Sequence, residues 1–343
     1  MSFELDPSFI VDMENRPNVN VAAIGREEVP VIDLSGDIER IVEEVGNACK
    51  ECGFLQVINH GVPLHLLEAM KETSKEFFDQ PMDEKKKAKR DEVNPVGYHD
   101  GEHTKNVRDW KEVYDFLIDD STLIPASPDP DCQELRTITN PWPKNPSQFR
   151  VVCQEYAGEM EKLAFKLMEI ICLSLGLPGG RLKGYFEEQT SFLRINHYPP
   201  CLFSDLTLGC GRHKDFDFLT VLAQDDVGGL EVKRNGKWVH VKPDPTALII
   251  NVGDICQVWS NERYKSVEHR AVVNGEKERY SFALFLVPSH HVMVKPLEEL
   301  VSEEDPPKYL PYNWGKFYAT RNRSDYKKQN VDNIQIHDFR VPN

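Results

Sequence analysis

"GRHKDFDFLTVLAQDDVGG" occupies residues 211–229, and "NHYPPC" precedes it at residues 196–201. Together they hold two histidines, a tyrosine, a cysteine and four aspartates, in a region that otherwise has the pattern of a β-sheet. Such groups are costly to bury unless something pairs with them. Two interpretations are open: ordinary solvated loops, or a metal site with His213 and Asp215 on one face of a strand.

The residues around these stretches predict a large all-β region between positions 190 and 288. Turn signals such as "VGG" at 227–229 separate its short apolar runs, and this spacing is typical of a jelly roll or a barrel. We expect eight strands, at "SFLRINHY", "FLTVLAQ", "LEVKR", "KWVHVKP", "ALIINVG", "ICQVWS" (255–260), "EHRAVVN" and "RYSFALFLVP".

The flanking regions have mixed character. We expect strands at 29–34 and 54–61, helices at 37–52 and 63–88, and a long backing helix at 147–176 that ends at a glycine. Residues 91–146 are rich in Pro, Asp and Asn, which predicts a linker or lid. The tail, 296–343, is expected to be loop and short helix. The fold class is therefore α+β, with a jelly-roll core, flanking helices and a helical N-terminal region.

Composition restricts the class of protein. The chain has 343 residues, 40% of them hydrophobic, so a sizeable core can form. Lys and Arg number 41 against 56 Asp and Glu, a net charge of −15, which argues against nucleic acid or an anionic membrane as partner. We expect a cytoplasmic, mostly monomeric protein that binds a small molecule. The N-terminus has no signal-peptide pattern, and the eight cysteines are expected to be free thiols.

A third residue strengthens the metal interpretation. His269, in "SVEHRAVV", lies 54 positions beyond Asp215. Two histidines and one carboxylate on one face of an octahedron form the facial triad of non-haem Fe(II) oxygenases. The three remaining positions suit a chelating co-substrate and O₂. "HDGEH", with His99 and His103, lies in a glycine-containing loop and is better explained as a lid segment than as a zinc site.

A strand further along the chain supplies an anion site. Arg279 and Ser281, in "RYSFALF", are two apart and share one strand face. An arginine in an apolar strand is costly without an anionic partner, and a guanidinium next to a hydroxyl suits a carboxylate. A small dicarboxylate, bound to iron at one end and to Arg279 at the other, satisfies both demands.

At this point the chain resembles the plant-type Fe(II)- and 2-oxoglutarate-dependent dioxygenases. The motifs that carry the resemblance follow one another over residues 29–290: "VPVIDLS", "GFLQVINHGV", "NPVGYHDGEHTKNVRDWKEVYDF", "RINHYPPC", "HKDFDFLTVLAQDDVGGLEV", "NVGDICQVWSNERYKSVEHRAV" and "ERYSFALF".

The resemblance implies a double-stranded β-helix fold and a set of roles. Iron is held by three ligands (His213, Asp215 and His269), and 2-oxoglutarate by a second group (Arg279, Ser281, Asn196 and Tyr198). The implied reaction hydroxylates or desaturates a plant small molecule, such as a hormone or specialised metabolite, with O₂ consumed and succinate and CO₂ released. Ascorbate is implied as a stimulant. Three parts are expected: an N-terminal region with a lid loop (1–146), the jelly-roll domain (187–289) and a C-terminal extension over the barrel mouth (290–343).

Two departures from the family pattern lie close to the candidate iron ligands. Lys214 replaces the usual threonine between the iron ligands, and alternation predicts that it faces away from the metal. Asp217 stands where the family often has a small residue. If strand alternation continues past Asp215, Asp217 and Phe285 both face the cavity and suit a substrate with a basic nitrogen or several hydroxyls. The alternative is that the chain turns after Asp215 and Asp217 is solvated or caps a backbone amide.

Two other functions stay open. An ascorbate-dependent oxidase of the ethylene-forming type shares the triad, although Asn196 and Tyr198 beside Arg279 favour 2-oxoglutarate. A non-catalytic jelly-roll binding protein is the second alternative, and the intact triad together with Arg279 argues against it.

Overall fold

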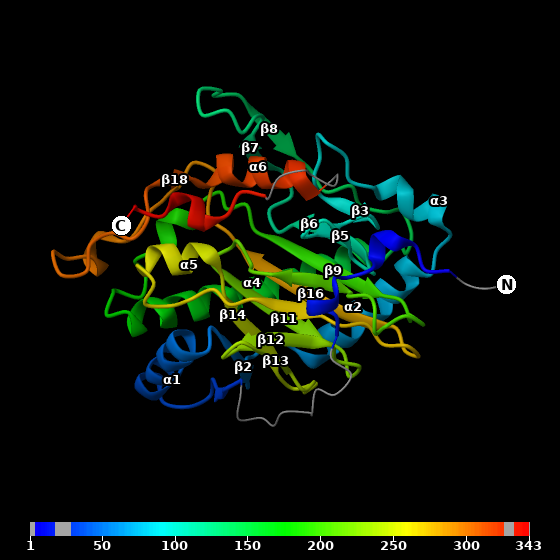
Figure 1. Ribbon diagram of the computed structural model, residues 1–343, viewed down its shortest axis with the longest axis horizontal. Helices are drawn as coiled ribbons and strands as arrows, with labels where there is room; N and C mark the ends of the chain where they lie inside the picture. Colours follow the sequence, from blue (N-terminus) through cyan, green and yellow to red (C-terminus); the bar gives the residue numbers. More distant parts are fainter. Residues whose placement is uncertain (1–3, 18–28, 326–332, 343) are drawn as a thin grey trace.

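An eight-stranded sheet forms the centre of the molecule in the computed structural model, which describes residues 4–17, 29–325 and 333–342. Neighbouring strands are antiparallel except for β1 and β2 (Figure 1). In spatial order the strands are β1 (Val31–Asp33), β2 (Phe54–Ile58), β14 (Leu248–Val252), β11 (Leu219–Gln224), β16 (Arg279–Leu286), β9 (Phe192–Tyr198), β6 (Glu112–Leu117) and β3 (Gly97–His99).

A smaller, four-stranded sheet completes the core. Its strands, in spatial order, are β10 (Cys210–His213), β15 (His269–Ala271), β12 (Leu230–Arg234) and β13 (Lys237–His240). Phe54 and Ile249 of the large sheet form one apolar cluster with Leu230 and Val232 of the small one, so the two sheets share a core. The predicted jelly-roll core with flanking helices is confirmed.

Helices cover one face of the large sheet. The central helix α4 (Phe149–Ser174) contacts β11 and β16, and α1 (Ile38–Glu51) and α2 (Leu64–Phe78) pack against α4. Alternate residues of β16 explain this packing, because Phe282, Leu284 and Leu286 belong to the apolar core that α4 joins. The intervening positions of β16 therefore point to the opposite face, and Arg279, Ser281 and Phe285 are among them.

Three local predictions are wrong. The expected helix at 63–88 stops at Phe78, and a short helix α3 (Met82–Lys85) follows Pro81, which is disfavoured inside a helix. The run at 255–260, expected as a strand, is the helix α5 (Asp254–Trp259). All six α5 residues are buried, and a short apolar run that is buried on every side does not reveal its period.

The third wrong prediction concerns residues 91–146, expected to be a linker or lid. This segment supplies β6 and β3 to the large sheet and forms two hairpins. The hairpins are β4 (His103–Thr104) with β5 (Val107–Arg108), and β7 (Thr122–Pro125) with β8 (Leu135–Ile138).

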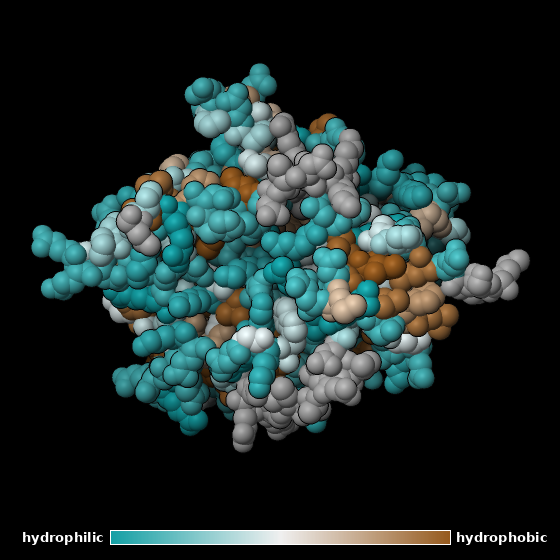
Figure 2. All heavy atoms as spheres, in the orientation of Figure 1, coloured by the Kyte–Doolittle hydropathy of each residue, from teal (hydrophilic) through white to brown (hydrophobic). Residues whose placement is uncertain are grey.

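The C-terminal region lies over one end of the core. It contains β17 (Met293–Val294), β18 (Tyr312–Asn313) and α6 (Trp314–Asp325), and α6 contacts β7 (Figure 1). The face drawn in Figure 2 is mostly hydrophilic. Within the described ranges, no helix combines the length and the apolar character that crossing a membrane requires.

Candidate active site

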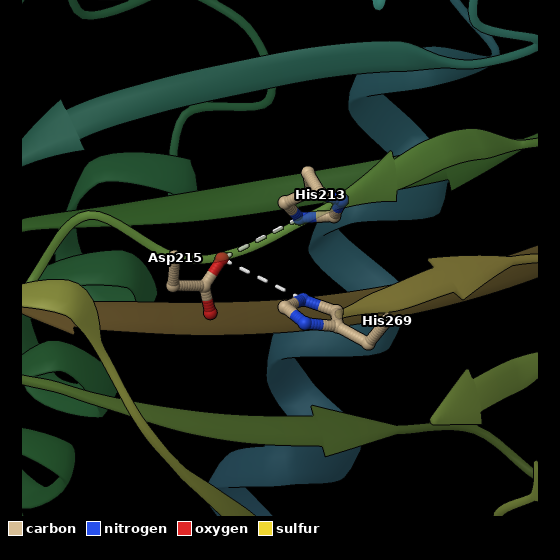
Figure 3. A group of neighbouring side chains, drawn as sticks. All are labelled: His213, Asp215 and His269. Atoms are coloured by element: carbon tan, nitrogen blue, oxygen red, sulfur yellow. Dashed lines mark ion pairs between the residues drawn. The ribbon is translucent and has the colours of Figure 1, made fainter. Parts of the chain in front are cut away.

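The small sheet brings two histidines together. His213 ends β10, His269 begins β15, and the two are paired across the antiparallel strands. Asp215 follows two residues after His213. Its Oδ1 lies 3.4 Å from His213 Nε2 and 3.5 Å from His269 Nε2 (Figure 3). The three candidate ligand atoms lie within 4.8 Å of one another, and no other such group of three occurs among the described residues.

Backbone carbonyls orient both imidazole rings. His213 Nδ1 lies 2.9 Å from the Gly211 carbonyl oxygen, and His269 Nδ1 lies 3.2 Å from that of Val267. A carbonyl only accepts, so Nδ1 carries a proton in each ring and Nε2 is the nitrogen that faces Asp215. Burial, with a contribution from His213, lowers the pKa of His269 to about 4. A neutral imidazole is the form that binds a metal ion.

The Asp215 carboxylate is held by its second oxygen. Oδ2 accepts hydrogen bonds from Thr220 Oγ1 at 2.5 Å and from Asn251 Nδ2 at 2.8 Å. Oδ1 is thereby turned to the two imidazoles. Two imidazole nitrogens and one carboxylate oxygen, presented from one side, are the donor set that non-haem Fe(II) prefers, so these residues fit the ion.

The expectation that Asp217 faces the cavity is wrong. β10 ends at His213 and β11 begins at Leu219, so strand alternation does not continue past Asp215. Asp217 is completely buried, its Oδ2 lies 2.8 Å from Thr220 Oγ1, and it does not line the cavity. Burial, together with the neighbouring Asp215 carboxylate, raises the pKa of Asp217 well above its usual range.

Arg279 is a buried cation with spare hydrogen-bonding capacity. The residue is 3% exposed, and its guanidinium lies 4.8 Å from the Tyr198 ring. Nη2 donates to Gln224 Oε1 at 3.2 Å, whereas Nε and Nη1 have no partner in the described part of the chain. A buried guanidinium with two unused donors fits an anionic ligand, and the planar fork suits a carboxylate.

The other residues predicted to bind the co-substrate lie on β16 and on its neighbour β9. In the register of β16 and β9, Arg279 pairs with Tyr198 and Ser281 pairs with Asn196. Asn196 Nδ2 donates to Ser281 Oγ at 3.4 Å. The structure therefore brings all four residues into one group on the large sheet.

A cavity of about 420 Å³ opens beside the candidate metal ligands, and His213 and Asp215 are part of its wall. Phe285 also lines it, as expected. Its ring stacks on Phe192 at 4.7 Å between centroids and lies parallel to Phe216 at 6.3 Å. Of the wall residues that sequence analysis did not find, Phe192 could have been found as the strand neighbour of Phe285.

Other wall residues are His103 from the β4–β5 hairpin, Lys214 from the loop after β10, and Tyr318 and Arg321 from α6. The C-terminal extension was expected over the barrel mouth, but no sequence signal indicated which of its residues line the cavity. His99, expected not to bind zinc, lies 3.3 Å from Asp115 through Nε2.

Comparisons with known proteins agree with this geometry. Residues 189–288 match the sequence profile of the 2OG-Fe(II) oxygenase superfamily. Residues 29–145 match a second profile, which is described as "non-haem dioxygenase in morphine synthesis N-terminal". Flavanone 3-dioxygenase 2 of Oryza sativa subsp. japonica is 36% identical over 311 residues, which are 88% of this chain and 86% of the relative. Gibberellin 20 oxidase 1 of Arabidopsis thaliana is 37% identical over 322 residues, which are 90% of this chain and 82% of the relative.

A solved structure shares the whole architecture. The crystal structure of JOX2 in complex with 2OG, Fe and JA superposes with a TM-score of 0.79 at 35% identity, covering 92% of this chain and 88% of JOX2. Relatives above 30% identity that are matched over most of their length establish common descent. The chain belongs to the 2OG-Fe(II) oxygenase superfamily, enzymes that use Fe(II) and 2-oxoglutarate.

Proposed function

We propose that this dioxygenase hydroxylates or desaturates a small molecule of the plant-hormone or specialised-metabolite kind, and that it releases succinate and CO₂. The observation that carries the proposal is the buried Arg279, whose Nε and Nη1 have no partner in the described part of the chain. A dicarboxylate co-substrate gives that cation its counter-ion.

In this proposal His213, Asp215 and His269 hold Fe(II). The ring orientations imposed by Gly211 and Val267 direct both Nε2 atoms to the metal position. Thr220 and Asn251 keep Oδ2 of Asp215 occupied, so the carboxylate offers the metal one oxygen.

Arg279 and Ser281 bind the distal carboxylate of 2-oxoglutarate in this proposal, with Asn196 and Tyr198 beside them. The guanidinium donates charge-assisted hydrogen bonds to that carboxylate, and the Tyr198 ring lies 4.8 Å from the guanidinium. When bound, iron and 2-oxoglutarate supply an oxidation in which one atom of O₂ enters succinate and the other is delivered to, or takes hydrogen from, the substrate. The protein positions the substrate and excludes water.

The substrate would lie in the cavity lined by Phe285. Among the relatives, one is named for a flavanone and one for a gibberellin, and the JOX2 structure contains JA. These names support a substrate of comparable size and do not select one class. We also propose the three-part division of the chain given above, with residues 290–343 covering the mouth, since Tyr318 and Arg321 line the cavity.

A succinate-release screen tests the proposal. Purified enzyme with Fe(II), 2-oxoglutarate, ascorbate and O₂ is offered small-molecule libraries, and products are identified by mass spectrometry. Stoichiometric succinate and an oxidised product are expected with the correct substrate, and neither with Asp215→Ala. Substrate oxidation that proceeds with ascorbate and without 2-oxoglutarate would instead identify the ethylene-forming type of oxidase.

A further inference from the structure

Asp109 is a buried carboxylate in the short loop between β5 and β6, and it belongs neither to the candidate metal ligands nor to the co-substrate group. The residue is 2% exposed. Its Oδ1 accepts a hydrogen bond from the backbone N–H of Gly211 at 2.9 Å, and its Oδ2 accepts one from Thr104 Oγ1 at 2.8 Å. Gly211 lies in β10, two residues before His213, and Thr104 lies in β4, on the cavity wall. Asp109 therefore joins the β4–β5 hairpin to the strand that carries a candidate iron ligand.

The backbone of β10 is irregular where Asp109 contacts it. The pairing of β10 with β15 shifts register between Cys210 and His213, and Gly211 lies in this interval. Such an irregularity interrupts the hydrogen bonds between strands and changes the direction of nearby side chains. A backbone N–H that has lost its strand partner needs another acceptor, and the Asp109 carboxylate supplies one to Gly211. Because the acceptor is charged, this hydrogen bond is stronger than one between neutral groups.

The hairpin and β10 approach each other so closely that glycine is needed at position 211. A Cβ atom on Gly211 would lie 2.8 Å from Thr104 Cβ and 3.0 Å from Thr104 Cγ2. Carbon atoms pack at about 3.5–4.0 Å, so a side chain at this position would push the hairpin away from β10. The close approach is what allows the Asp109 carboxylate to reach both Thr104 and the Gly211 N–H.

Lys111 compensates the charge of Asp109 and also contacts β10. It is 6% exposed, and its Nζ lies 3.3 Å from Asp109 Oδ2 and 2.6 Å from Glu102 Oε2. The same Nζ donates to Cys210 Sγ at 3.5 Å. A buried carboxylate without a counter-ion is strongly destabilising, so Lys111 is what allows Asp109 to stay charged at this place.

The contacts of this ion pair converge on one imidazole nitrogen. His213 Nδ1 lies 2.9 Å from the Gly211 carbonyl oxygen and 3.6 Å from Cys210 Sγ. Asp109 holds Gly211, and Lys111 holds Cys210. Both groups that His213 Nδ1 faces are therefore held by one ion pair from the loop between β5 and β6.

We infer that Asp109, with its counter-ion Lys111, is a positioning residue for His213: it fixes the Gly211 backbone and thereby the direction in which His213 presents Nε2. This inference rests on the proposed function, in which His213 binds Fe(II), and it adds a support outside the three ligands. An ion pair that only stabilised the fold would not change the metal affinity of a folded variant, whereas a positioning residue does.

Co²⁺ is the probe for the test, because it accepts nitrogen and oxygen ligands and its unpaired electrons shift the NMR signals of nearby protons. The wild type should give two shifted signals that exchange with solvent, from Nδ1–H of His213 and Nδ1–H of His269. Asp109→Leu should weaken Co²⁺ binding about tenfold, the lower end of the range for residues that orient metal ligands. It should also displace one of the two signals and leave the other, from His269, in place. Asp109→Asn keeps an oxygen for the Gly211 N–H and should restore both signals and most of the affinity.

Glu112→Gln is the matched control, because Glu112 is also a largely buried carboxylate that is paired with a lysine, Lys85. This variant should lose stability to urea, as Asp109→Leu does, but should keep the wild-type Co²⁺ affinity and both signals. Thr104→Val removes one contact of the Asp109 carboxylate and keeps its charge. It should weaken Co²⁺ binding in the same direction and by less, and it takes the place of Asp109→Leu if that variant does not fold.

Wild-type affinity and unmoved signals in a folded Asp109→Leu protein would overturn the inference. An equal loss of affinity in Asp109→Leu and Glu112→Gln would also overturn it, because the effect would then follow stability and not position. The same holds for a Thr104→Val protein identical to the wild type when the leucine variant does not fold. In each case Co²⁺ binding by the wild type leaves the proposed metal site standing, whereas a wild type that binds no Co²⁺ removes the proposed function together with the inference.

Discussion

The Thr220 hydroxyl lies 2.5 Å from Oδ2 of Asp215, on the side of the carboxylate that faces away from both histidines. The same hydroxyl lies 2.8 Å from Oδ2 of Asp217. A hydroxyl has one proton, so it can donate to only one of the two carboxyl groups at a time. The contact with Asp215 is the shorter of the two, and it holds the Asp215 carboxylate by Oδ2.

Thr220→Val should therefore weaken Fe(II) binding by about 10- to 100-fold, the range observed when the residues that orient metal ligands are changed. Thr220→Ser keeps the hydroxyl and should restore most of the affinity. Thr73→Val is a suitable control, because Thr73 is buried and its Oγ1 has no hydrogen-bond partner among the described residues. Anaerobic metal titration measures the effect, and equal affinity in the Thr220→Val and wild-type proteins would remove the positioning role.

Removing any of the three proposed iron ligands should abolish turnover and leave the fold intact. Alanine at His213, Asp215 or His269 deletes a donor atom, whereas the apolar cores lie elsewhere. Circular dichroism reports the fold, and metal analysis reports bound iron. His103→Ala, in the β4–β5 hairpin, should retain iron. Activity retained by Asp215→Ala would show that the metal lies somewhere else.

Arg279→Lys should raise the concentration of 2-oxoglutarate needed for half-maximal succinate release. Lysine keeps the charge and loses the planar fork, and a charged hydrogen-bonded contact is worth about 1.5–3 kcal/mol, roughly ten- to a hundredfold in affinity. Arg150→Lys, on the outer part of α4, is the corresponding control. An unchanged requirement for 2-oxoglutarate in the Arg279 variant would contradict the role given to this residue.

Sequence patterns predicted the candidate iron-binding and co-substrate-binding residues better than they predicted the positions of short strands. His213, Asp215 and Arg279 were found because their spacing and residue types are demanding, and Arg279 and Ser281 are polar residues two apart in a largely apolar run. The same alternation failed at Asp217, since β10 ends at His213 and the following loop has no period.

Strands β3 and β6 were missed for another reason. They are three and six residues long in a segment rich in turn residues, and β6, the neighbour of β3, joins the sheet only through the distant strand β9. The approach of Arg321 to Phe216 likewise depends on how α6 packs over the core, which no local pattern contains. The residues that line the cavity therefore depend on long-range packing, whereas the candidate iron ligands could be predicted from local sequence patterns.

Glu112, at the start of β6, should make the stability of the fold sensitive to acid. Burial alone would raise the pKa of this carboxyl, but hydrogen bonds from His197, Lys85 and Tyr98 outweigh it and hold the pKa at about 2. A group whose pKa is lower in the folded state stabilises the fold above its unfolded pKa, which is near 4.5, and this contribution is lost as the pH falls toward 2. After allowance for the solvent that reaches the side chain, the contribution is about 1–2 kcal/mol.

Glu112→Gln should therefore flatten the dependence of the unfolding free energy on pH between about 5.5 and 3, because glutamine does not titrate. The variant is also expected to be less stable at neutral pH, since Lys85 loses its buried partner. The slope, measured by urea unfolding at a series of pH values, separates the two effects. Glu43→Gln, at an exposed position of α1, should keep the wild-type slope. A Glu112→Gln slope equal to that of the wild type would mean that another carboxyl group controls the acid response.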